Sequence, residues 1–338
     1  MKATTTTTKS KPYKWINQEI AKLDPYKDYV EIWRLSTEYA GNNEFIQNLV
    51  YATTFSNFIP TPWGSEAVWR DDGGKVIYGS TERQYQTQMN NSIWWYYGPH
   101  DARAKKSADH INKIHEYYEN KYPGHFSHIN DFLYVMCFSA ATTHRLKERM
   151  GLKGFTEKQK TAAHIFWREM SALFVVYQDK PVSLKEHFPK DFDGIIKICE
   201  SMEENEMVPT EKGHLITEAL FDQFAYRFFP PGLRAVGRAL PNALSLPAML
   251  KANGIKPLHP VLCTILLWVL GCVLWFLETI MPDHQIAYQE YLSNMTAEEQ
   301  AKRRKERKDL DDKFPAYFSE FHKDAPGCPF TGGGKKMN

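Results

Sequence analysis

Residues 261–281, VLCTILLWVLGCVLWFLETIM, form an almost unbroken apolar stretch that contains one acidic residue, Glu278. About twenty apolar residues make a helix long enough to cross the hydrocarbon core of a bilayer. A helix buried inside a globular protein has the same composition, so apolarity does not decide between the two. The chain has 338 residues, 43% of them hydrophobic, and is long enough to enclose such a helix in a core. The stretch therefore predicts either a membrane-associated protein or a large domain around one hydrophobic C-terminal helix.

Most of the remaining sequence has apolar residues at helical spacing, interrupted by glycine and proline. Asn130-Asp131 is an expected N-cap, and Thr156-Glu157 is a clear helix start. Few stretches alternate between apolar and polar residues, so strands are expected to be minor. The pattern predicts an all-α fold with helices over 25–41, 44–58, 81–98, 101–119, 130–150, 156–178, 190–205 and 213–227.

Composition divides the chain into three parts. Residues 1–19 contain a threonine run and no apolar signal-peptide core, so we expect a disordered lead. Residues 20–290 form the expected domain, which includes the apolar helix 261–281. Residues 291–338 form a charged C-terminal tail with a glycine-rich end, in which 302–308 is almost entirely basic. Such a run is usually a solvated helix face, but beside a membrane helix it would instead meet anionic headgroups.

Charge and motifs argue against several classes of function, although a Ser/His/Asp triad of residues far apart in the sequence stays open. A formal net charge of +2 gives no indication of a nucleic-acid partner. The five scattered cysteines indicate neither a disulfide framework nor a structural zinc site. His115-Glu116 lacks the second histidine of HExxH, and His110 lies about 140° away from His115 around a helix. Glu211 and His214 match the di-iron pattern ExxH only once. Nucleophile-elbow and nucleotide-binding motifs are also missing from the sequence.

His115 has two interpretations. A histidine on an apolar helix is most often a core residue that is hydrogen-bonded to a neighbour. It can also be an axial haem ligand, which requires one imidazole and a large apolar pocket. The sequence is rich in aromatic residues, at 14%, and could supply such a pocket.

Several short motifs in order resemble one known family. Residues 20–285 resemble the family that unites the ER-bound oxygenase of mycophenolic acid biosynthesis with the bacterial latex-clearing proteins, the rubber oxygenases. Each motif is weak by itself, and the ordered set is moderately specific. The motifs are LDPYKDY at 23–29, RQYQT at 83–87, HINKIH at 110–115, NDFLYV at 130–135 and FWRE at 166–169.

The resemblance implies an all-α fold with a globin-like helical core that holds haem b. By this resemblance His115 is the proximal iron ligand, and Asn112 belongs to its surroundings. Arg83 and Thr87 lie one turn apart and fall on the distal side, where oxygen is handled. Glu66 falls near the position of the base proposed for the rubber enzymes.

This sequence departs from the family at three places. Gln86 stands where the latex-clearing proteins have a lysine, and Tyr85 and Gln86 stand where the mycophenolic branch has acidic residues. The loop around Gly73-Gly74 also makes the match of Glu66 insecure, so the bacterial reaction is not transferred to this chain. We do not expect the N-terminal anchor of the mycophenolic enzyme here.

The expected function is a haem-dependent oxygenase that uses O2 on a lipophilic terpenoid or polyketide, by oxidative C=C cleavage or another oxidation. The alternatives are a redox-neutral isomerase or cyclase on the same fold, and a non-catalytic haem- or lipid-binding protein. The expected location is a membrane, such as the endoplasmic reticulum, reached through 261–281; the alternative location is the cytoplasm.

Overall fold

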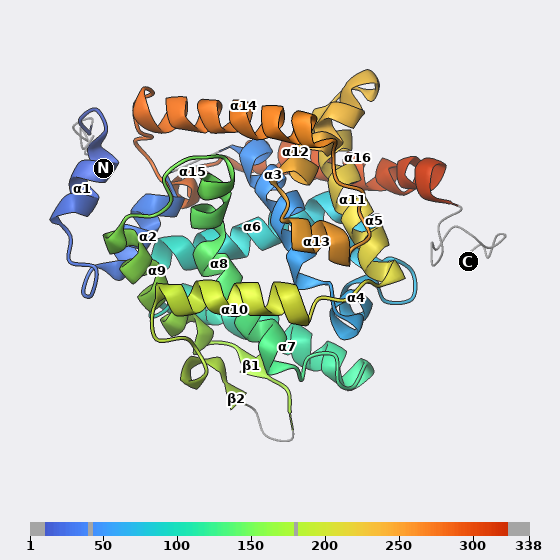
Figure 1. The fold of residues 1–338 in the computed structure, drawn as a ribbon, viewed down its shortest axis with the longest axis horizontal. Coiled ribbons are helices and arrows are strands. Elements are labelled where there is room, and N and C mark those ends of the chain that lie inside the picture. Colours follow the sequence, from blue (N-terminus) through green and yellow to red (C-terminus); the bar gives the residue numbers. More distant parts are fainter. Residues whose placement is uncertain (1–10, 40–42, 179–181, 324–338) are drawn as a thin grey trace.

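The structure, a computed structural model, describes residues 11–39, 43–178 and 182–323, and its fold is all-α as predicted (Figure 1). The strands of these residues form a single two-stranded antiparallel ladder. In chain order the elements are α1 (Trp15–Lys22), α2 (Tyr29–Thr37), α3 (Glu44–Thr54), η1 (Phe55–Phe58), α4 (Pro62–Trp69), α5 (Gly74–Tyr78), α6 (Ser80–Tyr97), α7 (Ala102–Lys121), α8 (Ile129–Arg149), α9 (Glu157–Ser171), β1 (Val175–Val176), β2 (Val182–Ser183), η2 (Leu184–Glu186), α10 (Phe192–Asn205), α11 (Glu211–Phe228), η3 (Pro231–Leu233), α12 (Arg234–Leu244), α13 (Pro247–Ala252), α14 (Pro260–Thr279), α15 (Tyr288–Ser293) and α16 (Ala297–His322).

The predicted helix starts agree with the structure in one case and differ in another. Thr156 caps α9 in a capping box with Gln159, as the sequence indicates. The prediction of an N-cap at Asn130-Asp131 is wrong, because α8 already begins at Ile129. The side chain of Asn130 instead donates to Glu206, and Asp131 accepts hydrogen bonds from Trp63 and Thr61.

The main core surrounds α8, which packs against α9 and α10 (Figure 1). Small buried residues of α8, including Ala140 and Ala141, allow these helices to approach closely. Aromatic rings fill the space beside them: Trp33 of α2 stacks on Phe166 of α9, with ring centroids 5.3 Å apart. Aromatic residues therefore make up a large part of this core.

The hydrophobic C-terminal helix is present as α14, and of the two alternatives for it the structure contradicts the buried core helix. Only 6% of its apolar window is buried, and it lies lengthwise along the surface of the body (Figure 1). It is also long and apolar enough to cross a membrane.

The N-terminal segment differs from the expected disordered lead. Residues 1–10 lie outside the described residues, but 11–19 are placed and include most of α1. Trp15 is buried because its ring packs edge-on against Tyr39, and its Nε1 donates to the carbonyl of His284 at 3.1 Å.

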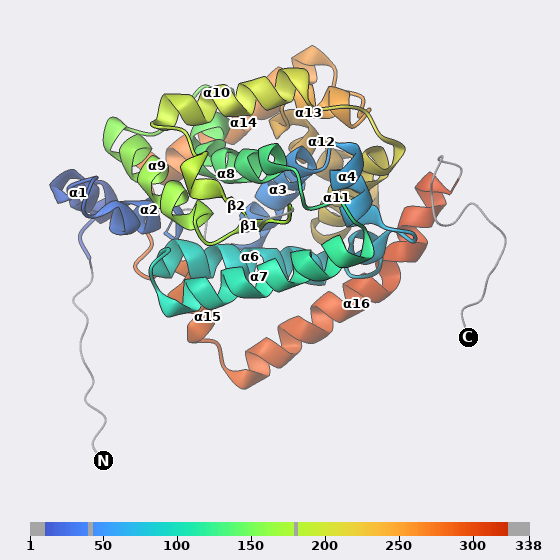
Figure 2. The same ribbon diagram turned by 90° about the horizontal axis from the view of Figure 1, so that it is seen from below.

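The C-terminal segment is a packed helix rather than a solvated tail, although its glycine-rich end lies outside the described residues. α16 runs beside α6 (Figure 2) and places Phe314 and Phe318 in a core. Within the basic run, Arg307 donates to Glu82 at 2.7 Å and stacks on Tyr85.

One residue of α16 completes the N-terminus of α6. The buried Asp311 carboxylate accepts the backbone N–H groups of Thr81 and Glu82 at 2.7 and 3.0 Å, and the hydroxyl of Ser80 at 3.4 Å. Residue 79, which precedes α6, supplies no side-chain cap of its own. Asp311 therefore satisfies the free N–H groups of the helix from a distant part of the chain.

Candidate functional site

Helices α6 and α7, which carry most of the predicted site residues, are consecutive and lie side by side (Figure 2). The connection turns at Gly98, whose φ of +77° is left-handed. A Cβ at this position would meet Val30 Cγ1 at 2.6 Å, so the turn also needs glycine for space. Asp101 then caps α7 by accepting the N–H of Arg103 at 2.8 Å. The predicted pair of helices joined at Gly98-Pro99 is thus confirmed.

His115 of α7 has the surroundings of a neutral imidazole. Its ring stacks on Phe126, with centroids 4.7 Å apart, and Phe132 approaches edge-on at 5.6 Å. Burial lowers the pKa of His115 to about 4, because the apolar surroundings disfavour the charged ring. Nδ1 is buried and has no hydrogen-bond partner among the described residues. His110, by contrast, is exposed.

Asn112 does not touch the His115 ring nitrogens. Its side chain donates to the carbonyl of Leu173 at 2.8 Å and accepts the N–H of Val175 at 3.4 Å. Its own carbonyl accepts the Tyr177 hydroxyl at 2.7 Å. In this arrangement Asn112 fastens β1 to α7 rather than orienting the imidazole.

Arg83 of α6 carries an unpaired positive charge. Its guanidinium lies over the ring of Phe55, 4.4 Å from the centroid, and forms no ion pair with a described residue. Burial lowers its pKa, and the nearby Arg70 guanidinium acts in the same direction. Arg70 lies over the ring of Tyr118 at 4.1 Å, and its buried Nε has no hydrogen-bond partner in the described chain. Two neighbouring guanidiniums without a carboxylate form a setting that attracts an anion.

Thr87, one turn after Arg83, lines a cavity of about 300 Å³ between α2, α3, α6, α8 and α14. The volume lies at the lower end of the range for small-molecule sites, about 300–1,000 Å³. Gln88 and Asn91 of α6 add polar groups to a mostly apolar wall. The aromatic lining residues are Trp33, Tyr51, Phe55, Phe58, Trp95, Trp167 and Tyr288.

Glu38 is a buried acid in the wall of the same cavity, and the sequence patterns did not identify it. Its side chain accepts the Ser92 hydroxyl and the backbone N–H of Gln289, each at 2.9 Å, and the residue is 1% exposed. Burial outweighs these hydrogen bonds and raises the pKa of Glu38 to about 7. A carboxyl group with this pKa can donate or accept a proton at neutral pH.

Glu66 does not reach the cavity. It lies on α4 with 45% of its side chain exposed and pairs with Lys212 of α11 at 2.5 Å. The arrangement gives Glu66 the environment of a surface ion pair.

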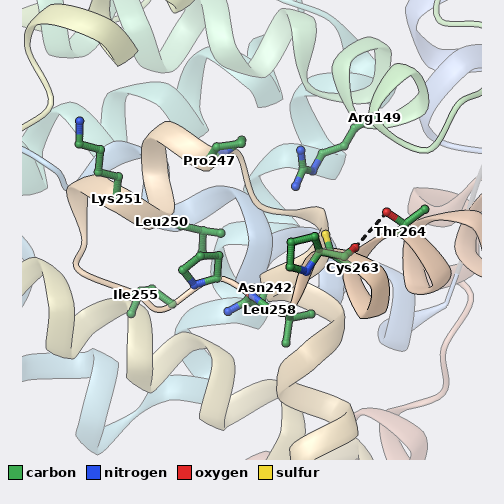
Figure 3. Close-up of a pocket in the computed structure, with 11 residues that line it drawn as sticks. Arg149, Asn242, Pro247, Leu250, Lys251, Ile255, Leu258, Cys263 and Thr264 are labelled. Atoms are coloured by element: carbon green, nitrogen blue, oxygen red, sulfur yellow. Dashed lines mark hydrogen bonds between the residues drawn. The ribbon is translucent and has the colours of Figure 1, made fainter.

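A second cavity, of about 560 Å³, lies at the N-terminal end of α14 (Figure 3). Arg149 reaches it from α8, and Cys263 from α14. Both Nε and Nη2 of Arg149 donate to the carbonyl of Ala243, at 3.0 and 2.9 Å. Asn242 fastens the loop beside it through Lys256 and Leu258. Prolines and aliphatic side chains supply most of the remaining lining.

A compact group of possible metal ligands lies elsewhere. Glu218, Asp222 and His322 place ligand atoms within 4.8 Å of one another. Arg238 pairs with both carboxylates, and His322 Nε2 contacts Asp222 at 2.7 Å. The cluster therefore contains its own cation, Arg238. His214, from the single ExxH match, is bonded instead to the carbonyl of Asn253.

The donor groups present suit a haem in part. A neutral imidazole with no competing hydrogen bond can act as an iron ligand, and unpaired arginines suit the haem carboxylates. Thr87 lines the cavity, whereas His115 is not among its lining residues. No family model matches the chain, and neither does any curated protein sequence.

Proposed function

We propose that this chain is a haem b-dependent oxygenase acting on a lipophilic terpenoid- or polyketide-derived substrate. The ordered motifs that resemble the mycophenolic and rubber oxygenases support this assignment. The structural observation that carries it is the neutral His115 imidazole, whose buried Nδ1 has no hydrogen-bond partner among the described residues. The resemblance also favours the endoplasmic reticulum membrane as the location.

The residues would divide the work as follows. His115 offers a ring-nitrogen lone pair to iron, and Arg83 with Arg70 offers guanidinium donors to the haem carboxylates. The haem, when bound, supplies the activation of O2. Thr87 offers its hydroxyl to a polar group in the cavity, while the aromatic wall holds an apolar substrate and excludes water. Glu38 exchanges a proton at its carboxylate oxygens.

The test is the visible spectrum of purified protein after haem supplementation, in oxidised and dithionite-reduced forms. We expect a Soret band that His115→Ala abolishes. His110→Ala is the matched control, because His110 is exposed on the same helix, and it should retain the band. A wild-type protein without a Soret band would refute the proposal. Haem retention without O2 consumption on any lipophilic substrate would leave a non-catalytic haem-binding protein instead.

A redox-neutral isomerase or cyclase is the second candidate, and Glu38 is the observation that favours it. A carboxyl group with a pKa near 7 in an apolar cavity can protonate a C=C bond and later accept a proton. Turnover under strict anaerobiosis, with no incorporation of oxygen from labelled O2, would select this candidate. Glu38→Gln should then abolish turnover and leave substrate binding intact.

A further inference from the structure

The helix α14 is attached to the body along one side. Leu267 and Leu270 pack with residues of α3, α8, α11 and α12, and Gly271 faces the end of α8. A Cβ on Gly271 would lie 2.6 Å from the backbone oxygen of Met150. This close approach fixes the middle of α14 against the protein.

Both ends of α14 are also held. At its C-terminal end Tyr13 donates to the carbonyl of Ile280 at 2.6 Å, and Lys147 pairs with Glu278 at 2.7 Å. At the N-terminal end the loop before the helix is bonded to Asn242 of α12. A helix fastened at three points along the body cannot also stand across a bilayer away from it.

The opposite side of α14 is exposed and apolar. Trp268 and Trp275 are 68% and 51% exposed, and Glu278 is the only charged residue between Pro260 and Thr279. The other large exposed side chains are Val261, Leu262, Ile265, Val269, Val273, Phe276 and Leu277. Tryptophans at the edge of an apolar helix face are typical of the membrane interface.

The charges around this face suit anionic headgroups. Lys256, in the loop before α14, is exposed and forms no ion pair with a described residue. The acids at the other end, Glu278 and Asp283, are each paired with a lysine. The border of the apolar face therefore has free positive charge, whereas its negative charge is compensated.

Two residues of the exposed side also line the cavity that contains Thr87 and Glu38. Val273 and Leu277 are about half exposed and belong to the cavity wall. The cavity therefore reaches the surface at the edge of α14.

We propose that α14 is an in-plane membrane anchor, embedded in one leaflet without crossing the bilayer, and that the cavity opens beside it to the lipid. A lipophilic substrate then enters from the membrane without passing through water. The anchor does not depend on haem; only the nature of the entering molecule rests on the proposed function.

Vesicle flotation tests the anchor with the full chain and vesicles of phosphatidylcholine and phosphatidylserine. The double variant Trp268→Gln/Trp275→Gln should float less well by on the order of tenfold or more, because each ring leaves the apolar phase. The matched control is Tyr117→Gln/Phe321→Gln, which removes two exposed rings elsewhere and should float like the wild type. Equal flotation of both double variants, or a stable dimer that does not bind vesicles, would overturn the proposal. The tryptophan variant should keep the visible spectrum of the wild type. A loss of vesicle binding can then be distinguished from a loss of haem binding.

Labelling decides between an in-plane and a spanning helix. Lys256→Cys and His284→Cys lie on either side of α14, and a membrane-impermeant maleimide added outside the vesicles should label both. The exposed Cys272 of α14 should lose its reactivity when vesicles are added. Labelling at only one of the two introduced sites would show a spanning helix and refute the in-plane orientation.

Uptake of a lipophilic dye, diphenylhexatriene, tests the opening of the cavity. Val273→Trp should slow transfer from vesicles without changing flotation, because Val273 lies at the opening. Val269→Trp is the matched control, since Val269 is exposed on α14 but does not line the cavity. Equal transfer in the two variants would exclude this route.

Discussion

Replacing Glu38 by glutamine should change how stability depends on pH. The pKa of Glu38 rises from 4.5 to about 7 in the folded chain because the carboxyl group is buried. Each unit of difference between the folded and unfolded pKa corresponds to about 1.4 kcal/mol. Ionisation of Glu38 therefore costs the folded state about 3 kcal/mol.

The direction follows from which state binds the proton. Below pH 4.5 the carboxyl group is protonated in both states, and the folded chain has no penalty. Between pH 4.5 and about 7 only the unfolded chain loses the proton, so the free energy of unfolding decreases as pH rises. Above about pH 7 the carboxyl group is ionised in both states, so its titration no longer changes the free energy of unfolding. The amide in Glu38→Gln does not titrate. The free energy of unfolding of this variant therefore lacks the decrease that Glu38 causes between pH 4.5 and about 7.

Urea unfolding followed by tryptophan fluorescence at several pH values between 4.5 and 8 measures the effect. Glu38→Gln should match the wild type within about 1 kcal/mol at the acidic end and exceed it by about 3 kcal/mol at pH 8. The matched control is Glu66→Gln, which removes an exposed, ion-paired carboxylate and should follow the wild-type profile. Parallel profiles for the wild type and Glu38→Gln would show that the buried carboxyl group does not cause the pH dependence of the free energy of unfolding.

Three further predictions concern other buried polar groups. Because the folded pKa of His115 is about 4, its ring should remain neutral at pH 5 by NMR, and acidification from pH 6.5 towards 4 should cost up to about 3 kcal/mol; a protonated ring at pH 5 would contradict this. Asp311→Ala leaves two N–H groups of α6 without acceptors and should lower the free energy of unfolding by about 1–3 kcal/mol in urea, with Asp312→Ala as the exposed control. Arg238→Ala should cost about 3–5 kcal/mol because the buried Asp222 carboxylate and the partly buried Glu218 carboxylate lose their cation. Zn²⁺ should then raise the melting temperature of Arg238→Ala but not of the wild type, and equal Zn²⁺ responses would refute the idea that Arg238 occupies the place of a metal.

Helical periodicity was enough to predict the class of fold, because it is a local property. The helices α6, α7, α8, α10 and α11 lie within two residues of the predicted ranges, and the start of α9 at Thr156 was also predicted. The predicted end of α9 at 178 is wrong, because the helix stops at Ser171 and Val175–Val176 form β1. The hydrophobic helix α14 was also predicted, but its position on the surface was not. Composition alone does not distinguish a buried apolar face from an exposed one.

The acid in the cavity could not be predicted from local patterns. Glu38 is buried by Ser92 and Gln289, which lie 54 and 251 residues further along the chain. The packing of the charged C-terminal segment could not be predicted for the same reason, because the partners of Arg307 and Asp311 lie on α6, far away in the sequence. The haem assignment of His115 remains a prediction.

Because Asp311 caps α6, this helix receives its N-terminal cap only late in the synthesis of the chain. Asp311 leaves the ribosome 230 residues after Thr81, whose N–H it accepts. At about 5–20 residues per second, the interval is roughly 10–50 seconds. During this time α14 has already been made, so the apolar helix is available to a membrane before α6 receives its cap. The proposed anchor therefore leaves the ribosome while the helix that carries Arg83 and Thr87 still lacks its N-terminal cap.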